Sequence, residues 1–248
     1  MLSDVYTIWL REMLRTMRAK SRVVSSLAMP FFWLLFIGVG IGSSLKLPGI
    51  DYINFLAPGI LGMILLFNSM FSGMSIIWDR QFGFLKEILV APISRNSVVL
   101  GKTLGGATVA VVTAVIMMIV SLAIGIIPLT FGVFPALVFM VLTAMIFVSL
   151  GLVIASRMRS MEGFQMVMTF LIMPVFFLSG AIFPIQNTPP WMQIVSHANP
   201  LTYGVDGIRG SFIGISLLPI WLDFAVLAGV AATLILLGGY SFKKSSMQ

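Results

Sequence analysis

Few side chains in this sequence have the types and spacing that catalysis or metal binding requires. The single histidine, His197, has no carboxylate or second potential ligand beside it, and cysteine is absent, so neither a metal centre nor a disulfide is expected. No pair of carboxylates, histidine cluster or activated nucleophile stands out along the chain. We therefore predict that the protein is not an enzyme.

The tripeptide Gly101-Lys102-Thr103 looks like the end of a phosphate-binding P-loop. That motif needs another glycine five residues before its second glycine, on a loop between a strand and a helix. Asn96 occupies that position, and a long apolar stretch follows the tripeptide. We therefore predict that the chain binds no nucleotide and carries no cofactor of its own.

The distribution of charge indicates what kind of element must position any functional residue. The chain is 59% hydrophobic and 9% charged, whereas a soluble domain has about 25% charged residues. A helix needs about 20 mostly apolar residues to cross a bilayer, because the hydrocarbon core is about 30 Å thick. The long stretches without Asp, Glu, Lys or Arg are 23–45, 52–78, 103–156, 163–205 and 224–242. The sequence therefore predicts an integral membrane protein.

We predict an all-α fold with six transmembrane helices, forming a single domain over residues 1–248. The stretch 103–156 holds two spans, with a turn at Pro128, Gly132 and Pro135. The six predicted spans are 23–44, 52–77, 103–127, 133–155, 163–183 and 217–240.

Lys and Arg predict the orientation of these spans. They gather in the N-terminal segment, in the second interspan segment, in the fourth and at the C-terminus, whereas the other side has only Lys46 and Arg209. The positive-inside rule therefore places both termini in the cytoplasm. The net charge of +7 follows from this topology, so no nucleic-acid partner is expected.

The N-terminal segment 1–22 has the pattern of an amphipathic interfacial helix. An apolar face (Leu2, Val5, Trp9, Met13 and Met17) recurs at helical spacing, and arginines occupy another face. Such a helix lies at the membrane surface with its cations near anionic head groups. The pattern fits a topological anchor and a brace for a cytoplasmic partner equally.

The cytoplasmic segment 78–102 has the pattern of a short helix and a turn. Phe82, Leu85 and Leu89 form an apolar stripe among charged residues, and Pro92 ends the helix because the residue before a proline avoids the helical region. Such an exposed stripe serves either as a docking surface or as a contact with the membrane.

The predicted spans lack the ionisable groups that proton- or sodium-driven carriers usually place inside the membrane. Asp223 is the exception, and it lies near the outer end of the sixth span, where it could sit at the interface. A secondary carrier that uses Asp223 is therefore an alternative, but the pattern favours a subunit driven by something attached to its cytoplasmic side.

Two segments add a more specific pattern. The cytoplasmic run 79–89 is followed by Pro92 and Ser94-Arg95, and the outer run 178–184 is followed by Asn199-Pro200-Leu201-Thr202-Tyr203. With these segments in this order, nearly the whole chain resembles the type 2 ABC exporter permeases, and most of all the daunorubicin-resistance type. These are six-span subunits that pair with a separate ATP-binding-cassette ATPase.

The resemblance implies two sets of site residues. The first is a loop, 78–102, that couples the permease to the ATPase, and the second is a signature in the outer loop, 184–216 and the residues just before it, that shapes an outer gate. The implied coupling residues are Arg80, Phe82, Leu85, Lys86, Glu87, Leu89, Pro92, Arg95 and Lys102. The implied gate residues are Gly180, Pro184, Pro200, Tyr203 and Arg209.

The resemblance also implies the activity. A pair of permeases, expected to be a homodimer, would work in the cytoplasmic (inner) membrane of a prokaryote with a soluble ATPase that binds ATP and Mg. The complex would export an amphipathic drug-like or lipid-like substrate. Export of a polysaccharide or glycolipid by the same six-span plan is the alternative.

Overall fold

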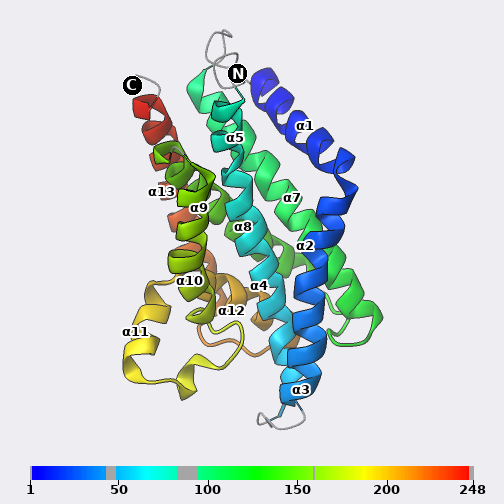
Figure 1. The fold of residues 1–248 in the computed structure, drawn as a ribbon. Helices are drawn as coiled ribbons and strands as arrows, with labels where there is room; N and C mark the ends of the chain where they lie inside the picture. The colour runs from blue at the N-terminus through cyan, green and yellow to red at the C-terminus, as the bar shows by residue number, and fades with distance from the viewer. Residues whose placement is uncertain (1, 43–48, 83–93, 159, 246–248) are drawn as a thin grey trace.

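The computed structural model describes residues 2–42, 49–82, 94–158 and 160–245, and the elements within these ranges are helices (Figure 1). Within these described ranges five helical segments are long and apolar enough to cross a membrane, and each corresponds to one of the six predicted spans. They are α2 (Lys20–Phe32) continued by η1 (Trp33–Ile37) and α3 (Gly38–Gly42), α4 (Tyr52–Gly73) continued by α5 (Ser75–Gln81), α7 (Arg95–Ala123), α8 (Val133–Arg157) and α13 (Ile220–Ser245).

The remaining predicted span is the shortest. It consists of α9 (Met161–Val167), η2 (Met168–Ile172) and α10 (Met173–Phe177). At about 1.5 Å per residue this segment is about 25 Å long, slightly less than the hydrocarbon core. It ends at Phe177 and not at residue 183, because the chain turns at Gly180, whose φ of 72° is the left-handed conformation that glycine adopts without strain. The prediction of an all-helical membrane fold is confirmed.

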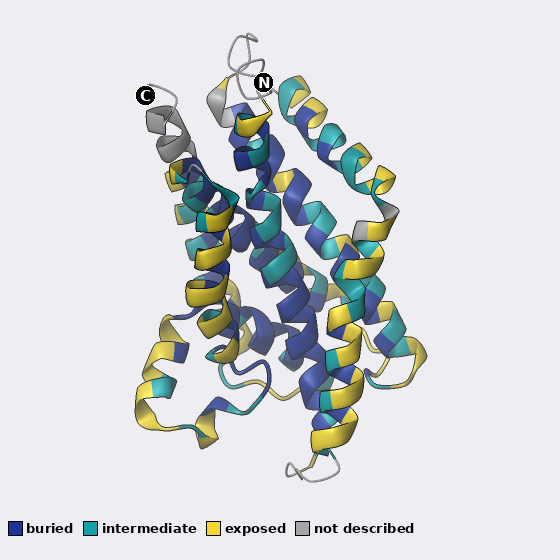
Figure 2. Cartoon of the chain, viewed as in Figure 1, coloured by how far each residue is buried: buried dark blue, intermediate teal, exposed yellow. Residues whose placement is uncertain are grey.

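Helix α4 forms the centre of the bundle (Figure 2). It packs against α7, α8 and α12 (Pro200–Ile213). A Cβ atom added to Gly73 would lie only 2.4 Å from the carbonyl carbon of Gly151, so α4 and α8 are in backbone contact there. Small residues at such crossings permit the close packing on which helix association in membranes depends.

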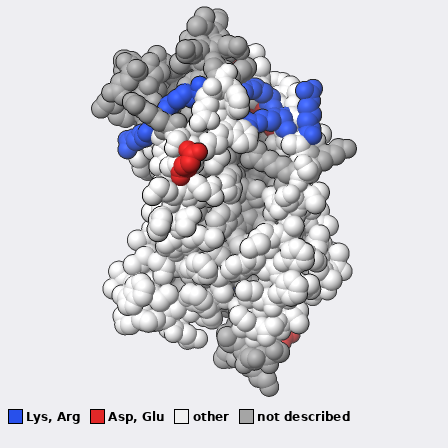
Figure 3. Space-filling view, viewed as in Figure 1, with Lys and Arg blue, Asp and Glu red and all other residues white. Residues whose placement is uncertain are grey.

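The two ends of the chain lie at the same end of the bundle. Helix α1 (Leu2–Arg18) begins at the end of the bundle where α5 ends and α7 begins, and α13 ends there too (Figure 1). On the face shown in Figure 3, Lys and Arg gather at this end and are missing from the middle of the molecule. By the positive-inside rule this end is cytoplasmic.

The outer segment is more ordered than the loop predicted over 184–216. It holds η3 (Ile185–Asn187), α11 (Pro190–Ala198) and α12, and α12 is largely buried between α4, α8 and α13. Pro190 and Pro200 each occupy the first position of a helix, where the missing N–H costs nothing.

Candidate coupling and gating sites

Helix α1 is seated on the cytoplasmic half of α7 by two glycines. A Cβ atom on Gly101 would lie 2.7 Å from Cβ of Ile8, and a Cβ atom on Gly105 would lie 2.8 Å from Cβ of Glu12. Ile8 and Glu12 are the buried residues of α1. The four-residue spacing of the glycines therefore makes a groove that receives one face of α1.

The buried face of α1 differs from the predicted apolar face. Leu2 and Met17 are 87% and 70% exposed, whereas Trp9 lies against α7 and donates a hydrogen bond from Nε1 to Oγ1 of Thr108 at 3.1 Å. The apolar residues at the two ends of α1 are thus left for the membrane. The helix is amphipathic, and it is also fixed to the bundle.

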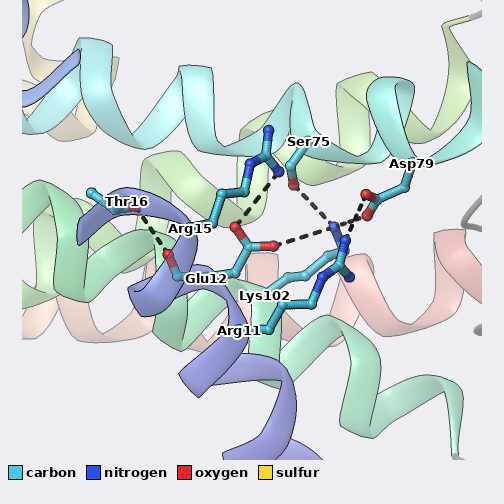
Figure 4. A network of polar contacts seen from close by, with 7 residues as sticks. All are labelled: Arg11, Glu12, Arg15, Thr16, Ser75, Asp79 and Lys102. Atoms are coloured by element: carbon cyan, nitrogen blue, oxygen red, sulfur yellow. Dashed lines mark hydrogen bonds and ion pairs between the residues drawn. The ribbon is translucent and has the colours of Figure 1, made fainter. Parts of the chain in front are cut away.

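A buried ionic network lies where α1, α5 and α7 meet (Figure 4). Its centre is Lys102, which is only 2% exposed. The ammonium Nζ lies 2.5 Å from Oδ2 of Asp79, 3.0 Å from Oγ of Ser75 and 3.8 Å from Oε1 of Glu12. A buried ammonium needs such partners, because an unpaired charge in a region of low dielectric constant is strongly destabilising.

Two arginines of α1 complete the network. Nη2 of Arg11 lies 3.0 Å from Oδ1 of Asp79, and Nη1 of Arg15 lies 3.9 Å from Oε2 of Glu12. The guanidinium of Arg15 also lies over the ring of Trp78, 4.8 Å from its centroid. Each buried carboxylate is thereby placed near two cations. The network joins α1, α5 and α7.

The predicted coupling residues that the structure describes lie around this network, although they do not form one site. Arg80 donates from Nη1 to the carbonyl of Met158 and from Nη2 to that of Ser156, both at 3.0 Å, and so holds the end of α8. Phe82 is 83% exposed. Lys102 lies inside α7 and not in the loop where the sequence placed it, and there it is neutralised by the network.

The other predicted coupling residues lie outside the description. The side chain of Arg95 is not described, although its backbone begins α7. The residues that fall in the undescribed segment are Leu85, Lys86, Glu87, Leu89 and Pro92.

Sequence reasoning missed the acidic members of the network, Glu12 and Asp79. Two signals pointed to them: Glu12 stands alone among arginines on α1, and Ser75 and Asp79 continue one face of a membrane span at helical spacing. Neither signal shows that these side chains meet.

At the outer end, Arg209 of α12 ties three segments together. It is 7% exposed, and it donates from Nη2 to the carbonyl of Gly180 at 2.9 Å and from Nε to the carbonyl of Phe55 at 3.4 Å. Its guanidinium also lies over the ring of Phe55, 3.8 Å from the centroid. This residue therefore connects α12 with α4 and with the turn after α10.

Asp206 lies one helical turn before Arg209 and is also buried. Its carboxylate accepts hydrogen bonds from the backbone N–H groups of Leu217 and Leu218 at 2.8–2.9 Å, which fixes the chain between α12 and α13. Burial raises the pKa of Asp206, while these hydrogen bonds and the positive charge of Arg209 act in the opposite direction.

The remaining predicted gate residues shape the same region. Pro184 precedes η3, Pro200 begins α12, and Tyr203 donates from Oη to the carbonyl of His197 at 2.6 Å. A cavity of about 280 Å³ has Gly180, Pro184 and Arg209 among its lining residues, but Pro200 and Tyr203 lie outside the lining.

Asp223 is fully buried near the start of α13, and in the described part of the chain neither carboxylate oxygen has a hydrogen-bond partner. The sequence allowed Asp223 a place at the exposed membrane interface, but the side chain does not lie there. A buried carboxylate without hydrogen-bond donors is costly when charged.

Comparisons with known proteins agree with this architecture. The family model described as ABC-2 type transporter matches residues 3–213. The inner membrane transport permease YadH of Escherichia coli K12 is 29% identical over 225 residues, covering 89% of this chain and 87% of the relative. The putative transport permease ycf38 of Porphyra purpurea is 26% identical, with 84% and 73% covered, and nodulation protein J of Rhizobium meliloti is 28% identical, with 89% and 85% covered.

Proposed function

The chain belongs to the family of ABC-2 type transporters, and from that premise we propose that it is the membrane-spanning permease of an ATP-driven exporter. In this proposal two copies of the chain pair in the cytoplasmic membrane of a prokaryote. A separate soluble ATPase binds ATP and Mg and supplies the energy. The permease moves an amphipathic drug-like or lipid-like substrate outward.

The observation that carries this proposal is the ionic network of Lys102, Asp79 and Glu12. In the proposed mechanism the partner ATPase presses on the segment 83–93, which connects α5 and α7 along the chain. Through Asp79 and Lys102, a displacement of that segment passes to α5 and α7 together, and through Glu12 it passes to α1. A motor outside the membrane needs such a stiff connection to move several spans at once.

The contacts at the outer end fit a gate that opens after the cytoplasmic helices have moved. Arg209 holds α12 against α4 and against the turn after α10 through hydrogen bonds to backbone carbonyls. In the proposed mechanism these contacts keep the outer end closed until the cytoplasmic helices move. The residues that shape this gate are Gly180, Pro184, Pro200, Tyr203 and Arg209, and their role is structural.

The chemistry of the cargo is the least constrained part of the proposal. The abundant Met and Phe side chains suit an adaptable apolar path. A polysaccharide or glycolipid substrate is the alternative within the same family plan.

Co-purification with a soluble ATPase tests the proposal, and two exposed phenylalanines make a matched pair for it. Phe82 is 83% exposed at the cytoplasmic end, and Phe131 is 90% exposed in the connection between α7 and α8 at the outer end. Neither substitution removes a buried contact, so both variants should remain folded. We expect Phe82→Ala to weaken ATPase binding and substrate-stimulated ATP turnover, and Phe131→Ala to leave both unchanged. Equal behaviour of the two variants would count against a partner surface at Phe82.

A secondary carrier that uses Asp223 is the second candidate, because this carboxylate is fully buried without a hydrogen-bond partner in the described chain. The two candidates differ in their response to Asp223→Asn in vesicles that contain the complex. The exporter predicts ATP-dependent transport that survives this substitution. A carrier predicts transport driven by a proton gradient without ATP, and loss of that transport in the variant.

A further inference from the structure

A second cavity lies beside the ionic network, between α1, α2, α4 and α7. Its volume is about 50 Å³, several times the ~10–15 Å³ that one water molecule requires. It is therefore large enough for a small polar group. Its lining residues include Glu12, Arg15, Asn68, Ser72, Ser75 and Trp78.

Arg15 is the group in this cavity with the most unused hydrogen-bonding capacity. A guanidinium has five N–H donors, yet the oxygen of Glu12 is 3.9 Å away, which is beyond hydrogen-bond distance. In the described chain Arg15 makes no hydrogen bond, and its side chain is 30% exposed. The ring of Trp78 supports the guanidinium at 4.8 Å, so its plane is held while its donors are left for a ligand.

The charges around the cavity favour an anion. Arg15 and Glu12 line the cavity, and the ionic network to which they belong contains the cations Arg11, Arg15 and Lys102 against the anions Glu12 and Asp79, so the network as a whole carries one excess positive charge. In the low dielectric of a partly buried site, such an excess attracts an anionic group more strongly than it would in water.

The wall formed by α4 and α5 supplies further polar groups. Asn68, Ser72 and Ser75 recur every three or four residues and therefore share one helix face. The hydroxyl of Ser72 has no hydrogen-bond partner in the described chain, and Gly106 leaves room for it, since a Cβ atom there would lie 2.2 Å from Ser72 Oγ. The second N–H of Asn68 also remains, because only one hydrogen bond from Nδ2, to the carbonyl of Ile64, is present among the described residues.

The helices at this cavity also present apolar side chains. Val23 of α2, Phe71 of α4 and Val109 of α7 are half-buried members of the cavity lining. A molecule whose polar group enters the cavity could lay its apolar part along these residues in the cytoplasmic leaflet.

We propose that this cavity binds the phosphate group of an anionic membrane amphiphile, with Arg15 as the main ligand and Ser72 and Asn68 as additional donors. Guanidinium and phosphate form charge-assisted, often bidentate hydrogen bonds, which matches the unused donors of Arg15. The site holds whether the amphiphile is cargo or a resident lipid, so it stands independently of the proposed function.

Native mass spectrometry of the full chain released from detergent tests the proposal. The probes are dioleoyl phosphatidylglycerol, dioleoyl glycerol, which has the same acyl chains without a phosphate, and inorganic phosphate. We expect one phosphatidylglycerol to be retained in preference to dioleoyl glycerol. Arg15→Gln should weaken its retention about tenfold, the loss expected for hydrogen bonds to a charged group, and Ser72→Ala should weaken it less. Arg157→Gln removes an exposed arginine that lies outside the cavity lining and is the matched control.

The result of the competition with inorganic phosphate shows which part of the amphiphile is recognised. Displacement of the lipid by millimolar inorganic phosphate would support phosphate recognition with a dispensable tail, and failure of phosphate to compete would support recognition of the whole amphiphile. Equal retention of dioleoyl glycerol, or equal weakening by Arg15→Gln and Arg157→Gln, would overturn the proposal. If Arg15→Gln does not give folded protein, Arg15→Lys and Ser72→Ala provide the same comparison.

Discussion

Replacing Lys102 with methionine removes the central cation of the ionic network and keeps a long, unbranched side chain in its place. Removing one partner of a buried ion pair costs about 3–5 kcal/mol. In this protein Asp79 keeps Arg11 at 3.0 Å and Glu12 keeps Arg15 at 3.9 Å, so both carboxylates retain a cation. We therefore expect a loss at the lower end of that range, about 3 kcal/mol.

Thermal unfolding of the purified chain in detergent measures this loss. A decrease of about 3 kcal/mol corresponds to a midpoint lower by roughly 6–12 °C for a chain of this size. The combined variant Lys102→Met with Asp79→Asn removes both members of the closest ion pair, so its loss of stability should be smaller than the sum of the losses of Lys102→Met and Asp79→Asn alone, because the two residues are in direct contact. Arg157→Gln, at an exposed position, is the control and should leave the midpoint unchanged.

The combined variant also separates stability from coupling. If the network transmits motion, the combined variant should fold but show reduced ATP turnover with its partner ATPase, because the ion pair between α5 and α7 is gone. A parent-like unfolding midpoint for Lys102→Met would refute the reasoning about the network. A combined loss equal to the sum of the two single losses would refute the claim that Lys102 and Asp79 act as a pair.

Three further predictions concern the contacts around the two sites. Gly101→Leu should displace α1 from α7, because even a Cβ atom would lie 2.7 Å from Ile8, and limited proteolysis should then cut near α1. Gly229→Leu is the control and should behave as the parent, because no atom lies within 4 Å of an added Cβ there. Arg209→Gln should lower the stability by about 2 kcal/mol, since it removes charge-assisted bonds to two backbone carbonyls, and a parent-like melting midpoint would contradict that role. Burial raises the folded-state pKa of Asp206, so the contribution of this group to stability is fully present below the ordinary pKa of 3.8 and is lost as the pH rises through the raised pKa. Asp206→Asn should therefore flatten this part of the pH–stability curve. An unchanged curve would show that another group titrates there.

The spans were predictable because the bilayer imposes a local rule on the sequence. The predicted first and fourth spans, 23–44 and 133–155, agree closely with the observed Val23–Gly42 and Val133–Arg157. The third span was placed too late, from 103, whereas α7 begins at Arg95. Lys102 lowers the hydropathy of the start of α7, which is why the predicted span begins after it. Inside the bundle Asp79 neutralises the charge of Lys102, and a hydropathy window along the chain does not register this contact.

The outer end was harder to predict for the same reason. Asp206 and Arg209, with prolines before them, are typical of an exposed loop, yet both lie in the buried helix α12. Their polar groups are satisfied by distant backbone atoms, such as the carbonyl of Phe55, which is 154 positions away in the sequence. The family resemblance predicted the gate residues as part of a sequence signature. Only the fold shows which of them line the outer cavity.

The central claim is that an external ATPase acts on the cytoplasmic segment next to Phe82, and site-directed cross-linking tests it most directly. The chain has no cysteine, so Phe82→Cys introduces its only thiol at a position that is 83% exposed. A maleimide–benzophenone reagent attached there should cross-link the chain to the co-expressed ATPase, and a membrane-impermeant maleimide should label it in inside-out vesicles only. Labelling from the outside, or photo-cross-linking to lipid without any ATPase adduct, would contradict the account.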